Sequence, residues 1–146
     1  MKYVYSFDEG NKDMRDILGG KGANLAEMTN LKLPVPKGFT VTTIACLKYY
    51  DDGMILDESI KDEIKNHIKN LENLTGCVFG SLDNPLLVSV RSGAKISMPG
   101  MMDTILNLGL NEKIVSSLIK KGFDERFVYD CYRRFIQMYS DVVMNL

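Results

Sequence analysis

The sequence predicts an α+β fold, because segments with the period of a strand and segments with the period of a helix follow one another along the chain. Residues 86–91 alternate between two faces, which is the pattern of a strand with one side on a core. Residues 57–74 instead repeat isoleucine and leucine at spacings of three and four, the pattern of an amphipathic helix. With 146 residues and 45% apolar side chains, we expect one globular core and no second domain of comparable size.

The first elements are a strand and a helix. Residues 3–7 alternate and predict the strand, which a polar turn over 8–12 follows. The glycines around Lys21 then form a turn that leads into a helix over roughly 22–31. The Pro34-Val35-Pro36 segment ends that helix, because the residue before a proline is driven toward extended backbone.

A second strand and two helices come next. Residues 38–42 are rich in β-forming side chains, and Thr43 is expected to cap a helix that runs through Tyr50. Asp57 is the candidate N-cap of a longer helix. The apolar stripe of this helix, which we expect in the core, consists of Ile60, Ile64, Ile68, Leu71 and Leu74.

Two strands and two helices complete the expected elements. A strand ends at Arg91, and after a loop a second alternating run extends to Leu110. Asn111 caps a helix that Gly122 ends, and Asp124 opens the last helix. The apolar stripe of that last helix consists of Phe127, Cys131, Phe135, Met138 and Val142.

The composition narrows the class of function. The net charge is −1 with both signs interspersed, so no basic face argues for nucleic acid. No apolar run approaches the roughly 18 residues of a membrane span, and the first residues lack the apolar core of a signal peptide. Three scattered cysteines without metal-ligand spacing fit reduced, structural thiols. We therefore expect a cytoplasmic protein that binds neither a membrane nor nucleic acid.

The loop after Arg91 has the composition of a flap that covers phosphates. Ser92, Gly93 and Gly100 let the backbone approach a ligand and offer N–H donors, while Pro99 limits the freedom of the loop. A guanidinium beside such a loop suits a polyphosphate. A long hairpin without a ligand is the alternative interpretation.

Three methionines gather in the same loop. Met98, Met101 and Met102 have flexible thioethers that could pack on a flat apolar ring. Filling a gap under the loop is an equally good interpretation, and the sequence leaves both open.

A second candidate anion site lies upstream, at Lys21. The glycines on either side of Lys21 form a turn at the start of a helix, where unpaired N–H groups and the helix dipole favour anions. The segment is not a Walker A loop, because Gly22 stands where that motif has serine or threonine. His67, the single histidine, has no polar partner nearby in the sequence, and we expect it to be structural or solvated.

Four motifs together resemble the N-terminal nucleotide-binding region of the pyruvate, phosphate dikinase family. They read GGKGANLAEM, LPVPKGFTVTT, NPLLVSVRSGAKISMPGMMDTILNLGLN and YRRFIQMYSDVV, and they extend over the whole chain. The SMPGMMDTILNLG loop is the most specific of these motifs. The related phosphoenolpyruvate synthases share the GGKG turn and the strand arginine but not the MPGMMDT loop.

The resemblance implies a partial, ATP-grasp-like N-terminal lobe. Residues 1–146 would be the N-terminal portion of an ATP-binding domain that looks truncated at its C-terminus. The implied reaction converts ATP, phosphate and pyruvate to AMP, pyrophosphate and phosphoenolpyruvate through a phosphohistidine outside this chain. The implied nucleotide-binding residues are Lys21, Arg91, Gly93, Ser97, Met98, Gly100, Met101, Met102, Asp103 and Thr104.

The resemblance also implies limits. Neither a catalytic residue nor a metal-ligand set is assigned in this chain, and Mg²⁺ is expected only in the full-length enzyme, together with a homodimer. Thr104 could equally be a simple first residue of a strand. We therefore expect the chain to be inactive alone. The alternatives are a stand-alone, non-catalytic ATP-binding, anion-binding or interaction module and, with less support, a fragment of a phosphoenolpyruvate synthase.

Overall fold

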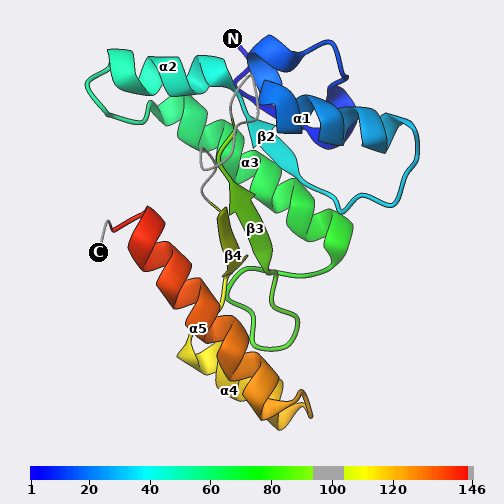
Figure 1. Cartoon of the computed structure of the whole chain (residues 1–146), viewed down its shortest axis with the longest axis vertical. Coiled ribbons are helices and arrows are strands. Elements are labelled where there is room, and N and C mark those ends of the chain that lie inside the picture. The colour runs from blue at the N-terminus through cyan, green and yellow to red at the C-terminus, as the bar shows by residue number, and fades with distance from the viewer. Residues whose placement is uncertain (94–103, 145–146) are drawn as a thin grey trace. The chain divides into compact units, whose positions relative to one another are not determined.

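The computed structural model describes residues 1–93 and 104–144, which divide into two compact units. Unit 1 comprises Met1–Thr75 together with Gly93, and unit 2 comprises Gly76–Ser92 together with residues 104–144. Figure 1 shows helices and short strands in both, which confirms the α+β class. Each unit has its own buried cluster, whereas the composition led us to expect one core.

Unit 1 is built around a two-stranded antiparallel sheet. Its elements are β1 (Val4–Ser6), the 3₁₀ turn η1 (Phe7–Glu9), α1 (Arg15–Asn30), β2 (Phe39–Val41), α2 (Thr43–Asp51) and α3 (Glu58–Thr75). Val4 pairs with Val41 and Ser6 with Phe39. Helix α3 packs against β1, and α1 packs against β2 and η1. Helices α1 and α3 thus both contribute to holding this small sheet in place.

Helix α1 has a break inside it. It begins at Arg15, well before the expected start at Gly22, because four residues ahead of the glycines are already helical. Gly19 then takes φ 75° and ψ 171°, which interrupts the helix. The helix resumes at the glycine-rich segment, so the glycine turn predicted from the sequence lies within α1.

The N-cap of α2 is one residue earlier than predicted. Thr42 is buried, and its Oγ1 accepts the N–H of Ala45 at 3.2 Å, so Thr42 and not Thr43 is the cap. Thr43 Oγ1 donates instead to the carbonyl of Asp16 at 2.6 Å. Two adjacent threonines are locally indistinguishable as caps, and the contact with α1 decides between them.

The stripe of α3 is less buried at its end than the sequence suggested. Ile60 is 0% and Leu71 7% exposed, as expected for core positions. Leu74 is 59% exposed. The prediction of Leu74 as core was wrong, because it lies in the last turn of α3, where its side chain is mostly exposed to solvent.

Unit 2 also contains one antiparallel pair of strands. Its elements are β3 (Val88–Arg91), β4 (Thr104–Leu108), α4 (Glu112–Lys120) and α5 (Glu125–Val142). The register has an irregularity between Val88 and Val90. Helix α5 packs against β4, and α4 packs against α5. The core here consists of Leu110, Ile114, Val115 and Val128.

Both predicted caps in unit 2 are confirmed. The Oδ1 atom of Asn111 accepts the N–H of Ile114 at 2.9 Å, and Oδ2 of Asp124 accepts the N–H of Phe127 at 2.9 Å. Phe127 itself is 62% exposed, whereas Val128 is 4% exposed. The apolar stripe predicted for this helix starts at Phe127, but the buried residue at this end of α5 is Val128.

Gly109, which follows β4, has no room for a side chain. Its φ is +118°, and a Cβ there would lie 2.4 Å from the carbonyl oxygen of Leu86. The residue after β4 thus lies closer to the segment before β3 than any side chain would allow. Only glycine fits this position.

Candidate functional site

Lys21 lies two residues after the break in α1. Gly19 and Gly20 are buried, whereas Lys21 is partly exposed. Because Gly19 is not helical, a second helical segment begins after it, and Lys21 lies in the first turn of that segment. The first N–H groups of a helix are the ones that anions bind. A cation at such a position suits an anionic ligand. The structure therefore retains the feature that pointed to Lys21.

Gly22 has a packing role next to Lys21. A Cβ on Gly22 would lie 3.1 Å from Cγ2 of Thr40 and 3.1 Å from Cβ of Leu18. The glycine thus allows α1 to approach β2 closely. Part of the glycine pattern is explained by packing alone, without any ligand.

Arg91 ends β3, as the sequence predicted. It is exposed and pairs with Thr104 of β4. Directly opposed residues of an antiparallel pair place their side chains on the same face, so Thr104 and Arg91 are neighbours there. The side chain of Val90 belongs to the other face, where its partner Ile105 is buried. The register thus brings two of the predicted site residues together.

Neither predicted cation is neutralised within the described residues. Lys2, Lys48 and Lys61 each form an ion pair with a carboxylate. Lys21 and Arg91 form no side-chain hydrogen bond or ion pair in residues 1–93 and 104–144. Their charges therefore have no carboxylate partner in this part of the chain.

The two cations belong to different compact units. Lys21 lies in unit 1 and Arg91 in unit 2. Gly93 is exposed, and no atom of residues 1–93 or 104–144 lies within 4 Å of a Cβ built on it. The remaining predicted site residues lie outside the described residues, namely Ser97, Met98, Gly100, Met101, Met102 and Asp103. That all these residues serve one ligand stays a prediction.

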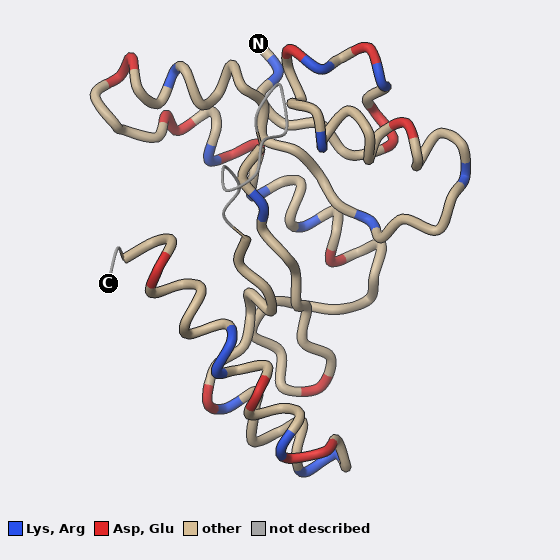
Figure 2. Tube along the Cα trace, viewed as in Figure 1, with Lys and Arg blue, Asp and Glu red and all other residues tan. Residues whose placement is uncertain are grey.

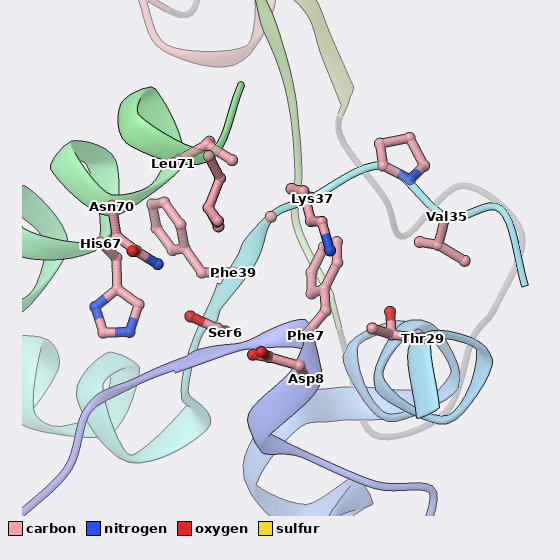
Figure 3. A pocket seen from close by; sticks show the side chains of 13 residues that line it. Ser6, Phe7, Asp8, Thr29, Val35, Lys37, Phe39, His67, Asn70 and Leu71 are labelled. Carbon is pink, nitrogen blue, oxygen red and sulfur yellow. The ribbon is translucent and has the colours of Figure 1, made fainter. Parts of the chain in front are cut away.

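Unit 1 contains a cavity that the sequence did not indicate (Figure 3). Its volume is about 90 Å³, and its lining comes from β1, η1, α1, α3 and the segment 35–39. Phe7 and Phe39 supply aromatic rings, and the Phe39 ring lies 5.5 Å from that of His67. Pockets that bury a ligand of drug size measure roughly 300–1,000 Å³. The cavity is therefore too small for a nucleotide.

A polar network fastens β1 and η1 to α3 beside this cavity. The Glu63 carboxylate accepts the N–H groups of Tyr3 at 3.0 Å and Val4 at 3.3 Å. His67 Nδ1 donates to the carbonyl of Glu63 at 2.8 Å, and its Nε2 lies 3.5 Å from Oε1 of Glu9. The sequence suggested no partner for His67, because Glu9 is 58 residues away along the chain.

The Glu9 carboxylate is the most perturbed group of this network. Its burial raises its pKa, but hydrogen bonds from the Lys2 ammonium, the Ser6 N–H and His67 outweigh burial and lower the pKa to about 2. The Ser6 N–H lies 2.8 Å from Oε1. Glu9 thus stays ionised and serves the structure of the N-terminal segment, because each of these partners favours its charged form.

The described residues do not offer a metal site. Residues 1–93 and 104–144 contain no group of three histidine, cysteine, aspartate or glutamate side chains that could hold an ion. Mg²⁺ usually binds through one or two carboxylates together with substrate phosphates.

Charges of both signs are spread along the described chain (Figure 2). On α5, for example, Asp130 pairs with both Arg133 and Arg134. No helix among the described residues is long and apolar enough to cross a membrane.

The chain matches a model of a protein family. The model describes the AMP/ATP-binding domain of pyruvate phosphate dikinase, and it matches residues 15–77 and 52–141. These ranges include Lys21, Arg91 and the predicted loop. The match therefore covers most of the chain.

Curated relatives agree with this match. A pyruvate, phosphate dikinase from Clostridium symbiosum is 61% identical over 145 residues, which cover 99% of this chain and 17% of that protein. The Rhizobium meliloti protein of the same name is 54% identical over 149 residues, with 99% and 17% covered. A chloroplastic pyruvate, phosphate dikinase 1 from Zea mays is 52% identical over 149 residues, with 99% and 16% covered. The chain thus spans about one sixth of the length of these relatives.

Proposed function

Because this chain belongs to the family of pyruvate phosphate dikinase AMP/ATP-binding domains, we propose that it holds the phosphates of ATP through Lys21 and Arg91. The observation that carries the proposal is the 61% identity over 99% of the chain to a protein named pyruvate, phosphate dikinase. The geometry supports it, since Lys21 follows a helix break and Arg91 ends a strand. Neither cation has an anionic partner among the described residues.

The loop between β3 and β4 completes the proposed site. Its predicted members are Gly93, Ser97, Met98, Gly100, Met101, Met102, Asp103 and Thr104. Backbone donors and fixed cations stabilise charge on a transferring phosphoryl group, and this stabilisation is the main source of phosphoryl-transfer catalysis. The proposed role of the chain is therefore to bind and orient the nucleotide.

The reaction of the longer protein forms part of the proposal. It would convert ATP, phosphate and pyruvate to AMP, pyrophosphate and phosphoenolpyruvate through a phosphohistidine outside this chain. The names of the relatives support a dikinase over a phosphoenolpyruvate synthase. Mg²⁺, a homodimer and a cytoplasmic location stay predictions for that protein, and so does the assignment of residues 1–146 as the N-terminal portion of its nucleotide-binding domain.

Calorimetric titration with ATP and Mg²⁺ tests the proposal on the 146-residue chain. Arg91→Ala and Lys21→Ala should each weaken binding by about 1–3 kcal/mol, the scale of a lost charge-assisted hydrogen bond. Lys65→Ala and Arg126→Ala serve as matched controls, because they remove exposed cations of α3 and α5. Their affinities should equal that of the unmodified chain.

Two results would contradict the proposal. Equal affinity of folded Lys21→Ala and Arg91→Ala variants would remove these residues from the site. A folded wild-type chain that binds no ATP would mean that the chain does not hold the nucleotide by itself. Circular dichroism spectra would establish that each variant is folded.

A further inference from the structure

The break in α1 requires a glycine. Gly19 has φ 75° and ψ 171°, a backbone region that essentially only glycine occupies. It is also buried, so a neighbouring rearrangement cannot easily relieve a side chain there. An uninterrupted helix would avoid this conformation altogether. The conformation persists only when the surrounding structure enforces it.

The surrounding structure holds both halves of α1. The half before the break is fixed by Thr43, whose Oγ1 donates to the carbonyl of Asp16 at 2.6 Å. The half after the break is fixed at Gly22, where a Cβ would lie 3.1 Å from Thr40. Thr40 belongs to β2 and Thr43 begins α2, so one short segment contacts α1 on both sides of Gly19.

The break determines the direction of Lys21. Each residue of an α-helix turns the next side chain by about 100° around the axis. A helical residue at position 19 would therefore rotate the second half of α1 relative to the first. The fixed halves could then not both keep their contacts with Thr40 and Thr43.

We infer that Gly19 is a positioning residue, which directs Lys21 toward the phosphates of the nucleotide through the break that Thr40 and Thr43 hold. This inference rests on the proposed function of Lys21. It adds a role for a residue that touches no ligand. It also explains why a strained conformation lies two positions before the proposed cation.

A double-mutant cycle on ATP binding tests the inference. The variants are Lys21→Ala, Gly19→Ala and the double variant, each titrated with ATP and Mg²⁺. Lys21→Ala should weaken binding about tenfold or more when Gly19 is present, as expected for a charge-assisted contact. In the Gly19→Ala background, Lys21→Ala should weaken ATP binding by less than about twofold, because the effects of coupled residues are not additive.

Gly53→Ala is the matched control. Gly53 also has a positive φ, of 78°, but nothing lies within 4 Å of its would-be Cβ. Alanine is strained at this position too, yet the effect of Lys21→Ala should remain about tenfold in this background, since the two sites are independent. Strain alone is thereby separated from positioning.

Thr43 provides a second route if Gly19→Ala does not fold. Thr43→Val removes the hydrogen bond to Asp16, whereas Thr43→Ser retains the hydroxyl. We expect Thr43→Val to reduce the effect of Lys21→Ala and Thr43→Ser to restore it. If Thr43 has a purely structural role, Lys21→Ala should weaken ATP binding equally in the Thr43→Val and Thr43→Ser backgrounds.

The outcomes separate the inference from the proposed function. An equal effect of Lys21→Ala with and without Gly19, or with and without the Thr43 hydroxyl, overturns the positioning role and leaves the ATP site standing. No effect of Lys21→Ala in the otherwise unchanged chain overturns the proposed role of Lys21, and the positioning role with it.

Discussion

The two regions that carry the proposed cations differ in how they are built. The helix-start region, residues 18–23, is mostly buried and packs closely against β2. The strand-end region, residues 88–93, is mostly exposed, and among the described residues nothing lies within 4 Å of a Cβ built on Gly93. Substitutions in the helix-start region should therefore change folding and binding together, whereas those in the strand-end region should change binding alone.

The largest expected contrast is between two apolar side chains. Leu18→Ala should destabilise the protein by about 2–5 kcal/mol, the cost of a cavity at a buried leucine, which here is 5% exposed. Val90→Ala should cost less than about 1 kcal/mol, because Val90 is 44% exposed. Urea denaturation followed by circular dichroism measures both free energies of unfolding. Similar losses at the two positions would refute the contrast.

A glycine pair gives the next contrast. Gly22→Val should cost about 1–3 kcal/mol of stability, because its side chain would press on Thr40 and Leu18. Gly93→Val should change stability by less than about 0.5 kcal/mol, since no atom in the described part of the chain lies within 4 Å of a Cβ built there. Thermal unfolding of the two variants measures the change in stability. Titration of Gly93→Val with ATP measures whether binding changes as well. A stable Gly22→Val variant would show that α1 can move away from β2.

The smallest contrast is in acid stability. The folded-state pKa of Glu9 is about 2, below its ordinary 4.5, so its contribution to stability is complete above about pH 4.5 and is lost as the pH falls toward 2. In Glu9→Gln, the free energy of unfolding should therefore fall less steeply with decreasing pH between about 4.5 and 2. Lys2→Met, which removes one hydrogen-bond donor to Glu9, should have a smaller effect of the same kind.

Asp130 provides the counterpart in unit 2. A hydrogen bond from Arg133 lowers the pKa of Asp130, but the carboxylate lies on the exposed face of α5. Water screens such a pair, so Asp130→Asn should change the acid stability less than Glu9→Gln. Denaturation curves between pH 2 and 5 compare the two, since roughly this range spans the titration of carboxylates. A larger effect at Asp130 would contradict the role given to the Glu9 network.

Most local signals in the sequence were reliable, although the cap of α2 is Thr42 and not the predicted Thr43. The caps at Asn111 and Asp124 were predicted correctly, because a cap depends only on a side chain and a backbone N–H three residues later. The end of β3 at Arg91 followed from the alternation of its side chains. Burial at the ends of helices was less predictable, as Leu74 and Phe127 show.

Contacts across long sequence separations could not be predicted. Glu63 accepts backbone N–H groups 59 and 60 residues away, and no pattern in either segment encodes that pairing. The break at Gly19 was foreseen only as a glycine turn, since nothing in the sequence indicated a helix before it. Of the candidate site, the sequence located Lys21 and Arg91 in their elements but gave no sign that different compact units hold them.

Gly109 has a consequence for genetic screens. Its positive φ and the nearby Leu86 carbonyl exclude every side chain, although it is not among the proposed ligand-binding residues. A saturation screen for loss of function would therefore find Gly109 as intolerant of substitution as Lys21, although for an unrelated reason. Abundance of the variant in cells, recorded beside activity, would distinguish a position that the fold requires from one that the nucleotide requires.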